Sequence, residues 1–229
     1  MPLVTLLAHA ALLARLASPP YPFAVGETLD YEATLGVIPI GTAHIAVKSM
    51  TRERGAEAFV FNAVGEGRPM GLRVGADLTS YVGTRGFTSL RFLRRLYQGG
   101  SVDEAQFQIV GDSSRYRQVG APQDWATPQS PLDELAFLYY LRTVPLAVGT
   151  TYQIPRYFKT GYNPIQVRVV SRAEWKLPDG RTVPALNLEI SSRNLLMNVT
   201  LTDDARRLPV QLDLPLPFGR VTLELTRVG

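Results

Sequence analysis

Short runs in which apolar and polar residues alternate dominate the chain from residue 23 to its end. Because successive side chains of a strand point to opposite faces of a sheet, this period of two predicts strands with one buried face. About 10–12 such runs are expected. They predict a mainly β protein, either a strongly curved antiparallel sheet or a partly open barrel. The clearest runs are 42–48, 59–64, 165–169, 186–191 and 221–226.

Turn residues separate these runs as hairpins require. The strongest signal is Pro178-Asp179-Gly180, because proline fixes one backbone dihedral angle and glycine accepts a positive φ. The segment therefore predicts a tight hairpin between two of the later strands. Weaker turn signals lie at Arg54-Gly55, Gly83–Gly86, Gly99-Gly100 and Gly111-Asp112.

One segment, residues 131–142, departs from the strand pattern and predicts a helix. We expect Ser130 to be its N-cap, Pro131 its first residue and Asp133 an acidic partner in the first turn. Pro145 is expected to follow its end. These signals together set both boundaries of the helix.

Apolar side chains surround nearly the whole circumference of this helix, which predicts burial on more than one side. In a chain otherwise made of strands, the concave face of a curved sheet offers such a position. Leu135 and Leu138 are then expected in the core, and the proline-rich segment 121–128 is a candidate flap over the helix.

The first 18 residues have the composition of a signal peptide. An apolar run of about a dozen residues precedes Ser18-Pro19-Pro20, which is too short to span a bilayer. We expect cleavage between Ala14 and Ser18, which leaves residues 19–229 as a single β-rich domain in the periplasm or otherwise outside the cytoplasm. The chain has no cysteine for acylation, and no later segment is expected to cross a membrane.

The side chains that usually perform catalysis near neutral pH are scarce. Beyond residue 18 the chain has one histidine, His44, and no cysteine. As a general base His44 requires an orienting carboxylate and a nucleophile, and the sequence contains no G-x-S-x-G motif to supply the latter. A lone histidine among scattered acids also lacks the spacing of a zinc site. We therefore predict no catalytic residue, no metal site and no cofactor, although an enzymatic role stays open.

Carboxylates offer the alternative chemistry, since acid pairs can hydrolyse glycosides when held at a defined separation. Asp203 and Asp204 are adjacent, and within Asp-Asp-Ala-Arg-Arg we expect them to cap a turn and pair with Arg206 or Arg207. The carboxylates that form the hydrolase alternative are Glu27, Asp77, Asp203 and Asp204.

Residues 91–97 interleave arginines with apolar and aromatic residues, as a single-stranded nucleic-acid platform does. The charge of +4 is spread without a basic block, and export argues against nucleic acid as a partner. A lipid phosphate or an acidic glycan is a candidate partner for this run. Cross-strand pairing with Asp103 and Glu104 is the favoured interpretation.

Three parts of the sequence are taken together: Gly26–Tyr31 with Ile38–Ala43, Asp133–Arg142 with Pro145-Leu146 and Gly149, and Thr202–Val210 with Phe218-Gly219. They resemble a bacterial family known only as a domain of unknown function in exported proteins. The resemblance implies export and a mostly antiparallel fold, and it brings no activity, cofactor or catalytic residue. A curved sheet over a helix is also similar in outline to the periplasmic lipoprotein carriers, an analogy of fold alone.

These observations favour a non-enzymatic binding or carrier domain for an apolar or amphipathic ligand, such as a lipid of the cell envelope. Two alternatives from other classes stay open. One is a carboxylate-dependent hydrolase of envelope glycan or peptide. The other is a structural, partner-binding protein that offers a sheet edge or the arginine-rich run.

Overall fold

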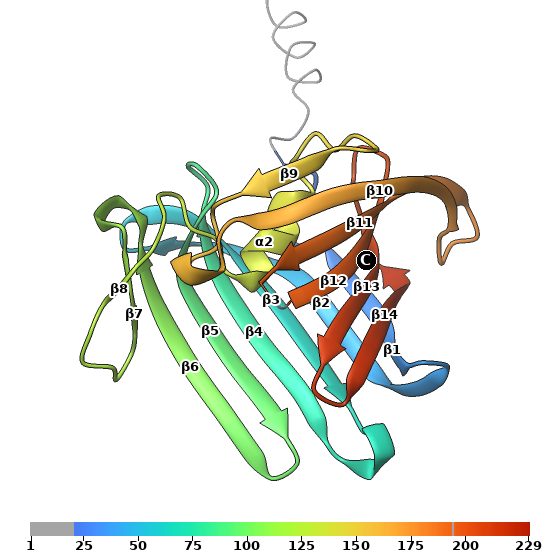
Figure 1. Ribbon diagram of the computed structural model, residues 1–229, viewed down its shortest axis with the longest axis horizontal. Helices are drawn as coiled ribbons and strands as arrows, with labels where there is room; N and C mark the ends of the chain where they lie inside the picture. The colour runs from blue at the N-terminus through green and yellow to red at the C-terminus, as the bar shows by residue number, and fades with distance from the viewer. Residues whose placement is uncertain (1–20, 194) are drawn as a thin grey trace, which may run out of the picture.

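One strongly curved antiparallel sheet forms the molecule (Figure 1). The computed structural model describes residues 21–193 and 195–229. Fourteen strands follow the order β8-β7-β6-β5-β4-β3-β2-β1-β14-β13-β12-β11-β10-β9, so β8 and β9 are the two edges and the barrel is not closed. The strands are β1 (Thr28–Leu35), β2 (Ile38–Glu53), β3 (Ala56–Gly67), β4 (Val74–Gly83), β5 (Thr88–Gln98), β6 (Ser101–Val110), β7 (Arg115–Gln118), β8 (Trp125–Ala126), β9 (Thr151–Ile154), β10 (Ile165–Lys176), β11 (Thr182–Ser192), β12 (Leu195–Thr202), β13 (Pro209–Leu216) and β14 (Gly219–Val228).

The predicted fold class is confirmed, and the strand count exceeds the expected 10–12. The additional strands are β7, β8 and β9, which are four, two and four residues long. Runs this short contain too few alternating positions to give a sequence signal. They lengthen the two ends of the sheet, and the remaining strands are the ones that the alternation predicts.

The expected helix is α2 (Glu134–Leu141), and its predicted start was wrong. Asp133, not Ser130, is the N-cap, and its side chain accepts hydrogen bonds from the N–H groups of Leu135 and Ala136. Ser130 has a φ of 51°, outside the helical region. Pro131 is not helical because this segment bonds to distant backbone: the Pro131 carbonyl accepts from Ser89 N–H at 2.7 Å.

The helix is buried on several sides, as its composition predicts. It lies on the concave side of the sheet (Figure 1), where Leu135 and Tyr139 belong to the same core cluster as Val167 of β10 and Leu188 of β11. Leu135 is buried as expected, whereas Leu138 is half-buried against the core. The two arms of one curved sheet therefore enclose the helix.

Segment 121–128 carries the two-residue edge strand β8 (Trp125–Ala126) rather than forming the flap considered from the sequence. Trp125 pairs with Tyr116 of β7 and stacks on its ring, with centroids 5.5 Å apart. The segment extends the sheet because its backbone pairs with the free edge of β7, and the N–H of Thr127 also donates to the carbonyl oxygen of Ser114.

The hairpin at Pro178-Asp179-Gly180 is confirmed between β10 and β11. Gly180 has a φ of 85° and donates its N–H to Leu177 at 2.9 Å. The remaining helical pieces among the described residues are short 3₁₀ turns: η1 (Pro69–Gly71), η2 (Gly111–Ser113) and η3 (Thr160–Tyr162). The predicted signal peptide, residues 1–18, lies outside the described residues. No helix within them is long and apolar enough to cross a membrane.

Candidate functional site

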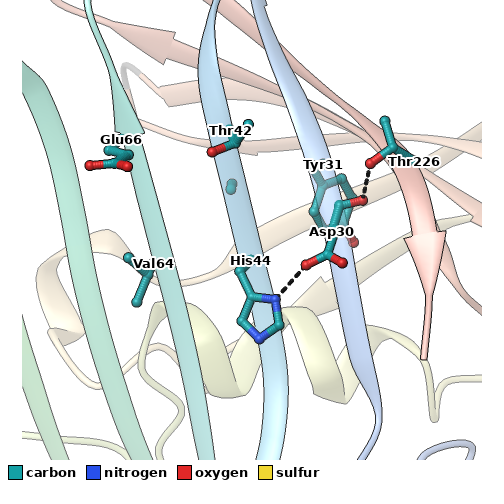
Figure 2. A pocket seen from close by; sticks show the side chains of 8 residues that line it. Asp30, Tyr31, Thr42, His44, Val64, Glu66 and Thr226 are labelled. Atoms are coloured by element: carbon teal, nitrogen blue, oxygen red, sulfur yellow. Dashed lines mark hydrogen bonds and ion pairs between the residues drawn. The ribbon is translucent and has the colours of Figure 1, made fainter.

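A shallow pocket of about 400 Å³ lies beside His44 on the outer face of the sheet. Figure 2 shows His44 and Thr42 projecting from β2 on the side of the sheet away from α2, next to Val64 and Glu66 of β3. Antiparallel pairing places these side chains together, since His44 is opposite Val64 and Thr42 is opposite Glu66. The rest of the lining consists of Asp30, Tyr31, Ala43 and Thr226.

Asp30 is the orienting carboxylate that the sequence analysis did not assign to His44. Its Oδ1 lies 2.5 Å from His44 Nδ1, and Arg227 Nε donates to its Oδ2 at 2.6 Å. The hydrogen bond with His44, followed by the one from Arg227, lowers the pKa of the Asp30 carboxyl below its ordinary value. The Asp30 carboxylate on β1 thus links side chains of the two neighbouring strands, β2 and β14.

The β1–β2 hairpin positions this pair through a bulge. Leu35 pairs with Ile38 across the turn, but the register shifts by one residue between Thr34 and Ala33, so that Asp30 faces His44. Without the shift Asp30 would face Ala43. A bulge of this kind inserts one extra residue in one strand and changes which residues are paired beyond it.

The pair resembles two members of a catalytic triad, but the third is missing within the described residues. The imidazole forms a single hydrogen bond there, the one with Asp30, and no hydroxyl group is bonded to it. No group of three metal-ligating side chains occurs in the same part of the chain. Asp30 therefore orients the imidazole of His44, but the described residues place no nucleophile for acyl transfer beside it.

The candidate carboxylates do not converge on one cleft, because each has its own partners. Both oxygens of Glu27 bind the guanidinium of Arg142, at 2.6 and 3.0 Å. Asp77 Oδ1 accepts from Asn62 at 3.1 Å. Glu27 precedes β1 and Asp77 lies in β4, and both contacts are structural.

Asp203 and Asp204 cap and pair in a turn, as the sequence predicts. Asp203 binds Arg172 of β10 at 2.8 Å and Arg207 at 3.4 Å. Asp204 Oδ1 accepts from the backbone N–H groups of Arg206 and Arg207 at 3.0 Å. The turn between β12 and β13 is closed by these contacts.

The arginine-rich run forms β5, and its charges are paired across strands as expected. Arg94 binds Asp103 at 2.8 Å and Arg95 binds Glu104 at 2.6 Å, both on β6. Arg91 binds Glu53 of β2 at 3.0 Å. Because these guanidinium groups already have carboxylate partners, the run has little free charge for a phosphate or an acidic glycan.

The helix is fixed to the sheet by a fully buried polar network around Asp133. Its Oδ2 accepts from Ser80 at 2.5 Å and from Ser89 at 2.7 Å, and Ser89 in turn accepts from Asp133 N–H at 2.8 Å. Burial raises the pKa of the Asp133 carboxyl to about 6, against the hydrogen bonds from Ala136, Ser80 and Ser89, which lower it. No sequence signal identified Ser80 and Ser89 as partners of the helix.

Exposed large apolar side chains gather at one end of the strands, along the rim of the sheet where several hairpin turns lie. The sequence analysis missed this cluster. Four hairpin turns lie along this edge (Figure 1, lower side), those joining β1 to β2, β3 to β4, β5 to β6 and β13 to β14. Val37 is 96% exposed, Met70 89% and Ile38 62%. We call the following residues the apolar edge: Val37, Ile38, Met70, Leu72, Val102 and Leu216.

Residues 30–226 match the family DUF3108, which is described as a protein of unknown function. The chain belongs to this family. The match includes every residue that lines the His44 pocket and every turn of the apolar edge. It brings no catalytic residue. A comparison with curated proteins found no match.

Two solved structures are similar to this chain. The β-barrel-like protein of the domain of unknown function DUF1849 from Brucella abortus is 9% identical, with a TM-score of 0.58 over 90% of this chain and 97% of that one. A protein with a YmcC-like fold from Bacteroides fragilis NCTC 9343, to which export has been ascribed, is 11% identical over 91% of this chain and 98% of that one, with a TM-score of 0.32. At this identity the first likeness concerns the barrel-like fold alone.

Proposed function

We propose that this DUF3108 protein is an exported, non-enzymatic component of the bacterial cell envelope that binds an apolar or amphipathic ligand at its apolar edge. The observation that carries the proposal is the exposure of Val37, Ile38 and Met70 on neighbouring turns. Single exposed apolar residues are ordinary, but a group of large ones on one edge is typical of an interaction site. The signal-peptide composition of residues 1–18 supports export.

The apolar edge is favoured over the interior as the ligand site. Side chains of α2 fill the concave side of the sheet, where Tyr139 stacks on Phe61 with ring centroids 3.9 Å apart. The buried contacts of Asp133 with Ser80 and Ser89 hold the helix in place. A ligand that entered the concave face would have to displace this packed element, whereas the edge is already open to solvent.

The hydrolase alternative has weaker support. It requires two carboxylates facing a common substrate, while Glu27 is bonded to Arg142 and Asp203 to Arg172. The structural alternative loses one of its two surfaces, because the arginines of β5 are ion-paired. The strand edges at β8 and β9 are the surface that this alternative retains.

Ligand binding is tested by titrating the full chain with a fluorescent lysophospholipid below its critical micelle concentration. The variant Ile38→Ser/Met70→Ser/Leu72→Ser removes three exposed apolar groups from the edge. If each buries even a third of its side chain against the ligand, affinity falls at least about tenfold. Their exposure means that the thermal unfolding midpoint should change little.

A matched control carries the same substitutions at exposed apolar residues away from the edge. Met50→Ser/Val119→Ser/Val170→Ser is suitable, since these side chains are 43%, 50% and 47% exposed. The control should bind as the unmodified chain does. Equal losses in both variants, or no binding by the unmodified chain, would refute the proposal.

Export is tested separately on fractionated cells that express the full chain. N-terminal sequencing of the protein recovered from the periplasmic fraction should begin between residues 15 and 19, after removal of the apolar run. A protein that begins at Met1 and remains in the cytoplasm would contradict the localisation.

A further inference from the structure

The turns that carry the apolar edge contain arginines and no acidic residue. Segments 36–39, 68–73, 98–102 and 215–220 include Arg68, Arg73 and Arg220, and neither aspartate nor glutamate occurs in any of them. All three arginines are exposed. The apolar edge therefore combines exposed apolar side chains with positive charge.

Backbone contacts hold these turns together as one surface. Arg68 N–H donates to Ile40 at 2.7 Å, which joins the β3–β4 turn to the β1–β2 hairpin. Gly99 N–H donates to Arg73 at 2.8 Å, which joins it to the β5–β6 turn. Leu35 pairs with Val221, which places the β13–β14 turn beside the first hairpin. The apolar and cationic groups are therefore contiguous and not scattered.

The arginines of the edge are available to an external anion. Within residues 21–193 and 195–229, Arg68, Arg73 and Arg220 form no ion pair, in contrast to the arginines of β5. Arg73 lies over the ring of Tyr97, 5.6 Å from its centroid, which supports the side chain without neutralising it. Guanidinium groups of this kind bind phosphate oxygens through paired N–H donors.

We propose that this edge docks the protein on an anionic lipid bilayer, with the hairpin tips inserted among the acyl chains at the interface and Arg68, Arg73 and Arg220 on the lipid phosphates. The inference rests on the proposed function and names its partner. Apolar side chains alternating with cations at one end of a rigid element are the composition of interfacial membrane anchors. The arrangement places the strands upright on the membrane, with the opposite edge, where the β2–β3 and β4–β5 turns lie, away from it.

The test is co-sedimentation of the full chain with vesicles of phosphatidylcholine alone and of phosphatidylcholine with phosphatidylglycerol. We expect binding to the anionic vesicles that weakens as salt is added, because each arginine near such a surface contributes about a fivefold gain in affinity. The variant Arg68→Glu/Arg73→Glu/Arg220→Glu should reduce this binding at least about a hundredfold.

The control places the same charge change on the opposite edge. Arg52→Glu/Arg85→Glu/Arg115→Glu alters three exposed arginines near the β2–β3, β4–β5 and β6–β7 turns and gives the same net charge. It should retain most of the binding. An equal loss in both triple variants would show a general charge effect and overturn the proposed orientation.

The outcomes separate this inference from the proposed function. Equal, salt-independent binding to both kinds of vesicle, lost in the serine variant of the edge, would refute the anionic docking and leave the apolar ligand site standing. Lysophospholipid binding without binding to either vesicle would do the same. If neither lysophospholipid nor vesicles bind, both proposals fail.

Discussion

Asp133 joins the helix to the sheet, and its replacement by alanine should be among the most destabilising single changes in the chain. The substitution removes the N-cap of α2, which costs about 1 kcal/mol. It also leaves the hydroxyl groups of Ser80 and Ser89, both fully buried, without their carboxylate partner. Each buried unsatisfied group costs about 1–3 kcal/mol, so the free energy of unfolding should fall by roughly 3–7 kcal/mol.

Asparagine at the same position is the matched control, because its carbonyl oxygen can accept from Leu135 and Ala136 while its amide donates to the serine oxygens. Asp133→Asn should therefore cost only about 1 kcal/mol near neutral pH. Urea unfolding followed by circular dichroism measures both losses. A loss below about 1 kcal/mol for Asp133→Ala, or equal losses for the two variants, would refute the role assigned to the network.

The pH dependence gives an independent check with a defined sign. The pKa of Asp133 is about 6 in the folded state, above its ordinary value of 3.8, so the folded state holds more protons between these values. The contribution of Asp133 to stability is largest below about pH 4 and decreases by roughly 3 kcal/mol as the pH rises through 6. The difference in stability between the unmodified chain and Asp133→Asn should follow this curve, and a flat difference would contradict it.

Three further changes test other parts of the structure. Leu135→Ala should lower the free energy of unfolding in urea by roughly 2–5 kcal/mol. Leu138→Ala should lower it clearly less, because only Leu135 is fully buried. Similar small losses in both variants would contradict the packed helix. Arg142→Ala should cost roughly 3–5 kcal/mol, because it removes the guanidinium that binds both oxygens of buried Glu27 and leaves only Arg206, 3.8 Å away. Adding Glu27→Gln should restore part of this, a recovery that the ion-pair argument requires. His44→Ala should leave vesicle and lysophospholipid binding unchanged. It should lower the free energy of unfolding by less than about 1 kcal/mol, since the imidazole is 42% exposed. A hundredfold loss of function in a folded variant would reopen the enzymatic alternative.

The sequence predicts most of the sheet because strand periodicity is a local property. The alternation in the long strands, the Pro178-Asp179-Gly180 hairpin and the buried character of α2 each depend on residues close together in the chain. Local patterns also predicted the pairing of Arg94 and Arg95 with β6, since a tight hairpin brings those carboxylates opposite. The apolar edge was missed because its residues lie on separate turns, where no single segment contains an apolar run.

Register and long-range contacts were decided by the tertiary structure. The β1–β2 turn alone would place Asp30 opposite Ala43, and the bulge at Ile40 moves it opposite His44. That bulge depends on a neighbouring strand: the Ile40 carbonyl accepts from Arg68, and a side chain at Gly41 would lie 1.9 Å from the carbonyl oxygen of Glu66. Such a close approach is possible only for glycine.

The start of α2 shows the same division between local and distant causes. Composition indicates a buried helix near residue 131, and the capping preferences of Ser130 and Asp133 are similar when considered locally. Asp133 is the N-cap because Ser80 and Ser89, 53 and 44 residues away, bind its second carboxylate oxygen. The sequence by itself thus determined which segments are strands and which is the buried helix, through local periodicity. Only the folded sheet decided the exact boundaries, partners and exposed edge, because those depend on residues that meet across the curved sheet.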